Sequence, residues 1–361
     1  MLPYWLLFSI FAAGSLNFQR KQAGGANSAP ILAVAGLFVA LMIGLRFEVG
    51  GDWANYEDIL IVTGYTSFGA VLRESDPGYG VLNWTAARLG WQIWFVNLIC
   101  GAIFSWGLIK FARQQPNPWL AVLIAVPYLI VVVAMGYTRQ GVAIGFIMAG
   151  LAGLERSSLL RFATYVVLAA TFHKSAVVVL PLVALAATQR RIIIVPALLG
   201  TALLLYYLFL DAAVDKLMTN YVDAEYQSEG ALVRVAMNVP PAIVFLLFYK
   251  RFELREQSRK IWRNLALASL LALLMLGLTT ATTAVDRIAL YLIPLQIFVL
   301  SRMPLAFGSR GQANGLLIAF VIAYSAAIQL VWLNYATHAS EWLPYQLFPL
   351  DHSAPLVPVG R

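Results

Sequence analysis

The chain has 361 residues, of which 61% are hydrophobic and 12% charged, with a formal net charge of +8. This composition, with a mean hydropathy of +0.76, excludes an ordinary soluble fold and indicates an integral membrane protein. The one cysteine, Cys100, lies in an apolar stretch, which excludes a disulfide framework and a cysteine metal site.

Twelve apolar segments follow one another and predict an all-α polytopic membrane protein with about 12 transmembrane or short broken helices. We expect them to form a single domain over residues 1–361, with both termini on the outer, periplasmic side. The first segment has no basic residues before it and is expected to be a retained span rather than a cleaved signal. The predicted segments are 2–18, 29–45, 93–111, 118–136, 140–154, 160–173, 175–188, 191–210, 235–250, 263–284, 288–301 and 313–334.

The charges between these segments predict the orientation. When the gaps alternate between two sides, the side opposite the N-terminus receives 16 of the 25 basic residues and only three of the 17 acids. Cytoplasmic loops retain basic residues, so this side is expected to be inside. The basic residues are spread over short loops and form no single patch, which argues against a nucleic-acid partner.

Three predicted outer segments are longer than turns: 46–90, 211–234 and the tail 335–361. The longest inner loop, 250–263, is short, and neither a G-x-x-x-x-G-K-[ST] nor a G-x-G-x-x-G motif occurs. ATP-driven transport by this chain alone is therefore not expected, and no cofactor is predicted.

Segments 160–173 and 175–188 are short for full crossings, because 14 helical residues rise only about 21 Å. The junction Phe172-His173-Lys174-Ser175 then either lines a watery cavity below the outer surface or forms a hairpin tip at the headgroups. His173 itself could bind phosphate, transfer a proton or satisfy a backbone group. No metal-ligand spacing surrounds it, so no metal site is predicted.

The outer segment after the second span begins with a dense motif, Arg46-Phe47-Glu48-Val49-Gly50-Gly51-Asp52-Trp53-Ala54-Asn55-Tyr56. The glycine pair allows a sharp turn and close approach to a ligand. Glu48 and Asp52 are candidate bases for a hydroxyl nucleophile. The alternative is structural, with Asp52 capping a helix that begins at Trp53.

Several cations lie at the outer ends of the predicted helices. A guanidinium within the bilayer usually faces a partner or a cavity, although an arginine near the interface can also extend to the headgroups. Converging arginines suit the oxygens of a doubly charged phosphate group. The candidate cations are Arg46, Arg139, Lys174, Arg234 and Arg287.

Four motifs in this order resemble the EpsG family of Wzy-like polysaccharide polymerases. They are R-x-x-x-G-G-D-W-x-x-Y from Arg46, Y-T-R-Q from Tyr137, F-H-K-S from Phe172 and D-R-I-x-x-Y from Asp286. The resemblance extends from Arg46 to Tyr345. The family more usually has Thr-Asp-Tyr where this chain has Gly-Asp-Trp at 51–53, which keeps the carboxylate and an aromatic ring.

The resemblance implies a GT-C-like membrane glycosyltransferase that uses sugars on a polyprenyl phosphate or pyrophosphate. Asp52 becomes the candidate base, with Glu48 as its alternative and His173 in support. The implied pyrophosphate-binding residues are Arg139 and Arg287, with Arg46 in support, and their position at outer helix ends adds Lys174 and Arg234 as candidates. The candidate sugar-binding residues are Tyr56, Trp53, Tyr137 and Tyr291, with interfacial anchoring as the alternative role for such aromatic rings.

The partners implied are a lipid-linked oligosaccharide, the growing glycan, membrane lipid and a chain-length regulator, in a bacterial inner membrane. Three other readings remain. They are a flippase for lipid-linked oligosaccharides, a GT-C enzyme or ligase that transfers one sugar or a finished glycan, and an acyltransferase that uses His173. Charge that clusters at the outer face favours surface chemistry over a central transport cavity.

Overall fold

The computed structural model describes residues 1–21, 29–154, 159–187, 196, 200, 230–279, 282–309, 311–348 and 350. The predicted span 191–210, apart from residues 196 and 200, lies outside this set. So do residues 211–229 of the second outer segment and nearly all of the tail beyond residue 348.

The described chain is almost entirely helical, with one two-stranded ladder. The first part contains α1 (Leu2–Lys21), α2 (Ala29–Gly44), β1 (Arg46–Phe47), α3 (Trp53–Tyr65), α4 (Phe68–Val71), α5 (Pro77–Arg88), α6 (Ile93–Ala112), α7 (Pro118–Ala125), the π-helix η2 (Val126–Ala134) and α8 (Thr138–Leu151). The middle part contains α9 (Leu159–Phe172), the 3₁₀ helix η3 (Lys174–Val178), α10 (Val179–Ala187), α12 (Ala231–Ala236), α13 (Val239–Phe248) and η4 (Tyr249–Phe252). The last part contains α14 (Glu256–Leu278), α15 (Thr282–Ala289), η5 (Leu290–Leu292), α16 (Ile293–Ala306), α17 (Gly315–Tyr335), η6 (Ala339–Trp342) and β2 (Gln346–Leu347).

Helix length and composition confirm the prediction of an all-α, multi-pass membrane protein. Among the described residues, five helical stretches are long and apolar enough to cross a membrane: 93–112, 231–252, 256–278, 282–306 and 315–335. Large apolar side chains stand exposed on these helices, including Leu247 at 69% and Leu316 at 82%. In a bilayer such a surface faces acyl chains rather than water.

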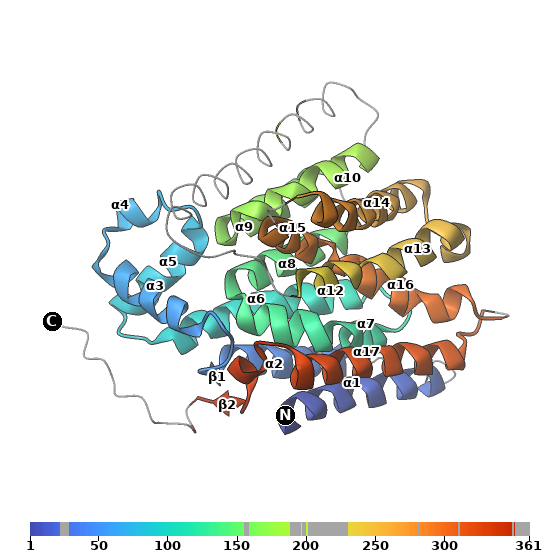
Figure 1. The fold of residues 1–361 in the computed structure, drawn as a ribbon, viewed down its shortest axis with the longest axis horizontal. Helices are drawn as coiled ribbons and strands as arrows, with labels where there is room; N and C mark the ends of the chain where they lie inside the picture. The colour runs from blue at the N-terminus through green and yellow to red at the C-terminus, as the bar shows by residue number, and fades with distance from the viewer. Residues whose placement is uncertain are drawn as a thin grey trace.

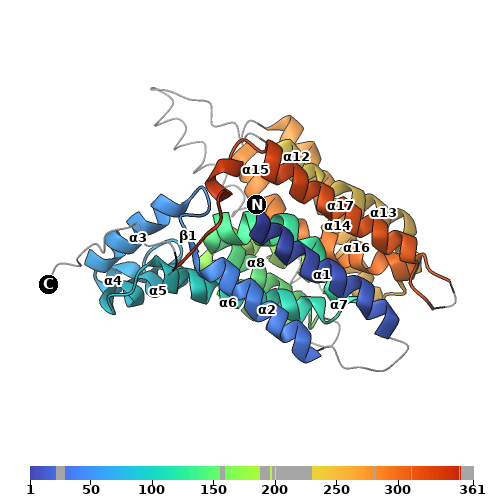
Figure 2. The same ribbon diagram turned by 90° about the horizontal axis from the view of Figure 1, so that it is seen from below.

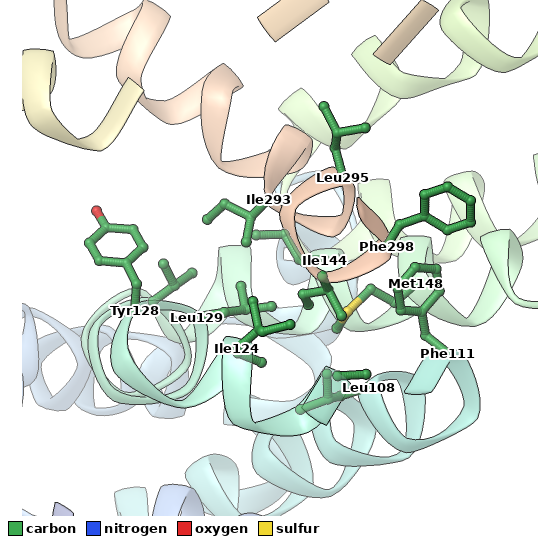
Figure 3. Packing of buried hydrophobic residues seen from close by; sticks show 14 of the residues in the cluster. Leu108, Phe111, Ile124, Tyr128, Leu129, Ile144, Met148, Ile293, Leu295 and Phe298 are labelled. Carbon is green, nitrogen blue, oxygen red and sulfur yellow. The ribbon is translucent and has the colours of Figure 1, made fainter. Parts of the chain in front are cut away.

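The 282–306 stretch lies at the centre of the bundle. In its most apolar part 83% of the residues are buried, compared with 28% in α17. On α16, Phe298 stacks on Trp262 of α14 with ring centroids 3.7 Å apart. Figure 3 shows α16 packed against the helices that carry Leu108, Ile124 and Ile144. This packing fixes the position of the residues that precede α16, among them Arg287 and Tyr291.

Helices α3 to α5 lie at one end of the bundle in both views (Figures 1 and 2). The ends of several long helices meet at this α3–α5 end. The Tyr4 hydroxyl of α1 donates to the carbonyl of Trp342 at 2.7 Å, beyond the end of α17. Strands β1 and β2 pair antiparallel, with Arg46 opposite Leu347 and Phe47 opposite Gln346. The segment after α17 therefore closes over the motif that follows α2.

Candidate active site

The turn at Gly50 brings the Arg46–Tyr56 motif against the start of α8. Gly50 has φ 105°, and a Cβ there would lie 2.8 Å from the carbonyl oxygen of Met135 and 3.0 Å from Cα of Gly136. Its N–H donates to the carbonyl of Glu341 at 2.8 Å. Only glycine fits at this position, because any side chain would collide with the backbone of Met135 and Gly136. The turn therefore brings the backbone before Asp52 close to the segment that leads into Tyr137.

Asp52 immediately precedes α3, where an aspartate commonly caps the first turn. The helix begins at Trp53, as the structural alternative from the sequence requires, but the Asp52 side chain makes no capping hydrogen bond. The side chain is half-buried. Its carboxylate therefore remains available for a ligand.

Tyr56 lies between Asp52 and the arginines from later parts of the chain. Burial raises the pKa of Tyr56 to about 12. Four charges lie close enough to act on that pKa, with Asp52 raising it and three cations lowering it: Arg139, Arg46 and Arg287. The fold thus brings the candidate base and two candidate phosphate-binding arginines around one buried hydroxyl.

Arg139 enters this region from the first turn of α8. Its side chain is 36% exposed, and its Nη1 binds Oδ2 of Asp76 at 2.8 Å. The guanidinium carbon lies 5.9 Å from the ring centroid of Tyr79. Among the described residues its Nε has no acceptor. The positive end of the α8 dipole adds to the attraction for an anion at this point.

Asp76 was not identified by sequence reasoning. Asp76-Pro77 reads as an ordinary helix start, and α5 does begin at Pro77. The carboxylate does not cap the helix, however, and its Oδ1 instead accepts from the backbone N–H of Lys174 at 3.1 Å. Burial raises the pKa of Asp76, while Arg139 opposes this shift. One acid therefore joins Arg139 to the α9–η3 junction.

At the α9–η3 junction, two hydroxyl groups contact the His173 ring. His173 Nδ1 lies 2.6 Å from the Ser175 hydroxyl and 3.2 Å from the Tyr291 hydroxyl. A hydroxyl that donates to Nδ1 leaves the ring proton on Nε2, where it can serve as a donor. The helix break between α9 and η3, which the sequence predicts, is present; its depth in a membrane stays a prediction.

The charge state of His173 follows from its surroundings. Burial, followed by the positive charges of Arg139, Arg287 and Lys174, lowers the pKa of His173 to about 3. The imidazole is therefore neutral at physiological pH. The charges of these three cations thus act on one ring.

Arg287 reaches this region from α15. Its guanidinium carbon lies 4.0 Å above the ring centroid of Tyr137, the residue before α8. The side-chain amide of Gln140 donates to the carbonyl of Arg287. The guanidinium makes no ion pair within the described part of the chain. Stacking thus orients Arg287 without using up its hydrogen-bond donors.

Arg46 has a different environment from the other cations. It is 1% exposed, and its guanidinium donates to the carbonyls of Ile43 and Val49 and to the side chains of Asn97 and Thr138. These bonds tie the end of α2 to α6 and α8. The geometry therefore makes Arg46 a residue that positions the motif.

Arg234 and Glu48 are in different surroundings from the cation cluster, which consists of Arg139, Lys174 and Arg287. Arg234 forms a bidentate ion pair with Asp286, with N–O distances of 2.7 and 2.9 Å. Glu48 is exposed in a left-handed backbone conformation, φ 49°. Burial raises the pKa of the Glu57 carboxyl, and the charge of Glu48 adds to that shift.

Three of the four candidate sugar-binding aromatics are buried. Trp53 is 9%, Tyr56 4% and Tyr291 1% exposed, whereas Tyr137 is half-buried beneath Arg287. Burial leaves little surface of these three rings exposed, and sugar binding by the four aromatics stays a prediction. Among the described residues there is also no group of three His, Cys, Asp or Glu side chains that could hold a metal ion.

The sequence model of the EpsG family matches residues 31–347. The chain belongs to the EpsG family. The match covers all four motifs and both strands that close the α3–α5 end. Membership in the EpsG family indicates a polysaccharide polymerase-type role. Comparison with curated proteins and with solved structures gives no match.

Proposed function

We propose that this EpsG-family chain is a glycosyltransferase that polymerises oligosaccharide repeat units carried on polyprenyl pyrophosphate. The product would be an exopolysaccharide or an O-antigen-type glycan, made at the outer face of a bacterial inner membrane. The observation that carries the proposal is the Asp52 carboxylate, which makes no capping hydrogen bond and acts together with the charges of Arg139 and Arg287 on the Tyr56 hydroxyl.

In this reaction Asp52 removes the proton from an acceptor sugar hydroxyl. The acceptor oxygen forms a bond to the anomeric carbon of the donor glycan, and the bond from that carbon to the pyrophosphate oxygen breaks. The leaving pyrophosphate takes the electron pair, and the proton on Asp52 passes to water. Asp52 is preferred to Glu48 because Asp52 is half-buried and acts on the same Tyr56 hydroxyl as Arg139 and Arg287, whereas Glu48 is exposed.

The cations stabilise the negative charge that develops on the leaving group. Arg139 and Arg287 supply guanidinium forks, Lys174 adds a point charge, and neutral His173 donates from Nε2. Asp76 holds Arg139 in position through its 2.8 Å ion pair. Arg46 and Arg234 act on the site through the elements that they hold.

The test uses protein in nanodiscs with a polyprenyl-pyrophosphate-linked repeat unit, with products separated by gel and mass spectrometry. We expect a ladder spaced by one repeat unit that is absent for Asp52→Asn. Asp58→Asn, an exposed acid in the same helix α3, is the matched control and should keep the ladder.

If the Asp52→Asn protein still made a ladder, another group would be the base. Addition of a single unit would indicate a transferase or ligase. Transfer of the lipid-linked unit across proteoliposomes without any ladder would favour a flippase.

A further inference from the structure

A pocket separate from the cation cluster opens between α12, η2 and α17. Its volume is about 450 Å³, within the range of roughly 300–1,000 Å³ usual for small-molecule sites. One wall is a single face of α17, since its residues recur every three or four positions. These residues are Tyr324, Ala327, Ile328, Val331 and Tyr335.

The pocket is open at the side of the bundle. Val233 of α12 is 61% exposed and Val331 of α17 is 53% exposed, and they stand on opposite walls. In a multi-pass membrane protein these side chains face acyl chains. A ligand with an apolar chain can therefore enter directly from the bilayer.

Two hydrogen-bond donors in the pocket wall lack acceptors within the described residues: the Tyr128 hydroxyl and Nε1 of Trp332. Tyr128 is only 6% exposed, and its ring meets that of Trp332 edge-on at 6.0 Å. In Figure 3 the Tyr128 hydroxyl points away from the other labelled side chains of the core. Buried donors are normally paired, so the pocket suits a ligand that brings acceptor oxygens as well as an apolar chain.

The polar side of the pocket adjoins the candidate active site. Arg234 lines the pocket and binds Asp286, the neighbour of Arg287. Tyr128 lies close enough to interact electrostatically with Arg234, Asp286, Tyr137 and Arg287. An anionic head group at this side of the pocket would therefore lie toward the stacked Arg287–Tyr137 pair.

We propose that this pocket binds the isoprenoid chain of the donor lipid, whose pyrophosphate is the leaving group. This inference rests on the proposed function for the identity of the lipid. The apolar α17 face holds the chain, the two unpaired donors bind phosphate oxygens, and the lateral opening admits the lipid. Isoprenoid chains longer than the pocket continue into the bilayer through the opening between α12 and α17.

The test is photolabelling in nanodiscs by polyprenyl phosphate with a benzophenone in its first isoprene units, followed by peptide mapping. Label is expected on α12 and α17. Ala327→Trp fills the pocket and should lower labelling about tenfold, equivalent to about 1.4 kcal/mol of lost binding free energy. Leu330→Trp is the matched control, since Leu330 is 50% exposed on α17 but does not line the pocket.

A second variant, Ile328→Ala, removes apolar contacts without adding bulk and should also weaken labelling. It provides the test if Ala327→Trp fails to fold. Unlabelled polyprenyl phosphate should compete, and phosphatidylglycerol at the same concentration should not. Equal competition by phosphatidylglycerol, or equal labelling of Ala327→Trp and Leu330→Trp, would overturn the proposal. Specific labelling in a protein that makes no glycan ladder would support the pocket while contradicting the polymerase.

Discussion

The carboxylate of Asp76 binds the Arg139 guanidinium at 2.8 Å and also accepts the backbone N–H of Lys174 at 3.1 Å. It thereby joins the start of α5 to α8 and to the α9–η3 junction, through Arg139 and Lys174, which are 63 and 98 residues from Asp76 along the chain. A proposed phosphate-binding arginine and lysine are thus held by an acid that would not itself contact phosphate.

Asp76→Asn should reduce turnover about tenfold or more while changing the unfolding free energy by only about 1 kcal/mol, because the Arg139 side chain is partly solvated. Polymerisation rate and melting temperature in detergent are the measurements. Asp58→Asn is the control on an exposed acid. Equal turnover in the two variants would remove Asp76 from the site.

Arg139→Lys should lower the polymerisation rate about 100-fold, because a point charge replaces a fork that can bind two oxygens. The protein should still fold, since a lysine can pair with Asp76. Rates are compared with those of Arg88→Lys, at an arginine stacked on Trp84 in the same outer segment. A normal rate at normal protein level would contradict this role.

Arg46→Met should impair folding rather than phosphate binding. Loss of the guanidinium leaves buried acceptors unpaired, among them those of Asn97 and Thr138, at about 1–3 kcal/mol for each. Thermal unfolding monitored by size-exclusion chromatography should show the loss, while Arg73→Met, at an exposed arginine, should not. A stable Arg46→Met protein with selectively weakened lipid binding would instead return Arg46 to the phosphate site.

Gly136→Ala should destabilise the α3–α5 end, because its Cβ would collide with the Trp342 ring, whose Cη2 would lie 2.9 Å away. Overpacking of this kind costs about 1–3 kcal/mol. Gly69→Ala, with nothing within 4 Å of its Cβ, is the control. Combining Gly136→Ala with Trp342→Phe should recover part of the loss, and strict additivity of the two changes would contradict the collision.

The pKa of His173 predicts how stability depends on pH. The folded-state pKa is about 3, below the ordinary value of 6.5, so between these values the unfolded chain binds the extra proton. Stability from this group is therefore full above about pH 6.5 and falls by at most about 1.4 kcal/mol per pH unit below it. Melting temperatures from pH 7.5 to 5 should fall more steeply for the wild type than for His173→Gln. Parallel curves would show that His173 is not buried in its neutral form.

Some features could be predicted from local sequence because local chemistry determines them. Apolar segments of helical length determined the all-α membrane fold, and Gly50 beside Asp52 predicted a tight turn before α3. The ordered motifs gave the family, which the match to residues 31–347 confirms. The predicted orientation and count of 12 crossings rest on charge distribution and segment counting alone.

Only the tertiary structure decided what each charged residue contacts. Arg46, Arg139, Arg234 and Arg287 look alike in sequence because each follows or ends an apolar stretch. In the fold, Arg46 is buried and makes four hydrogen bonds, Arg234 is paired with Asp286, and the charges of Arg139 and Arg287 both act on Tyr56. Asp76 was missed for the same reason. Whether a charged side chain is buried, paired or available for a ligand depends on residues that are distant along the chain. Only the packing of the helices brings those residues together.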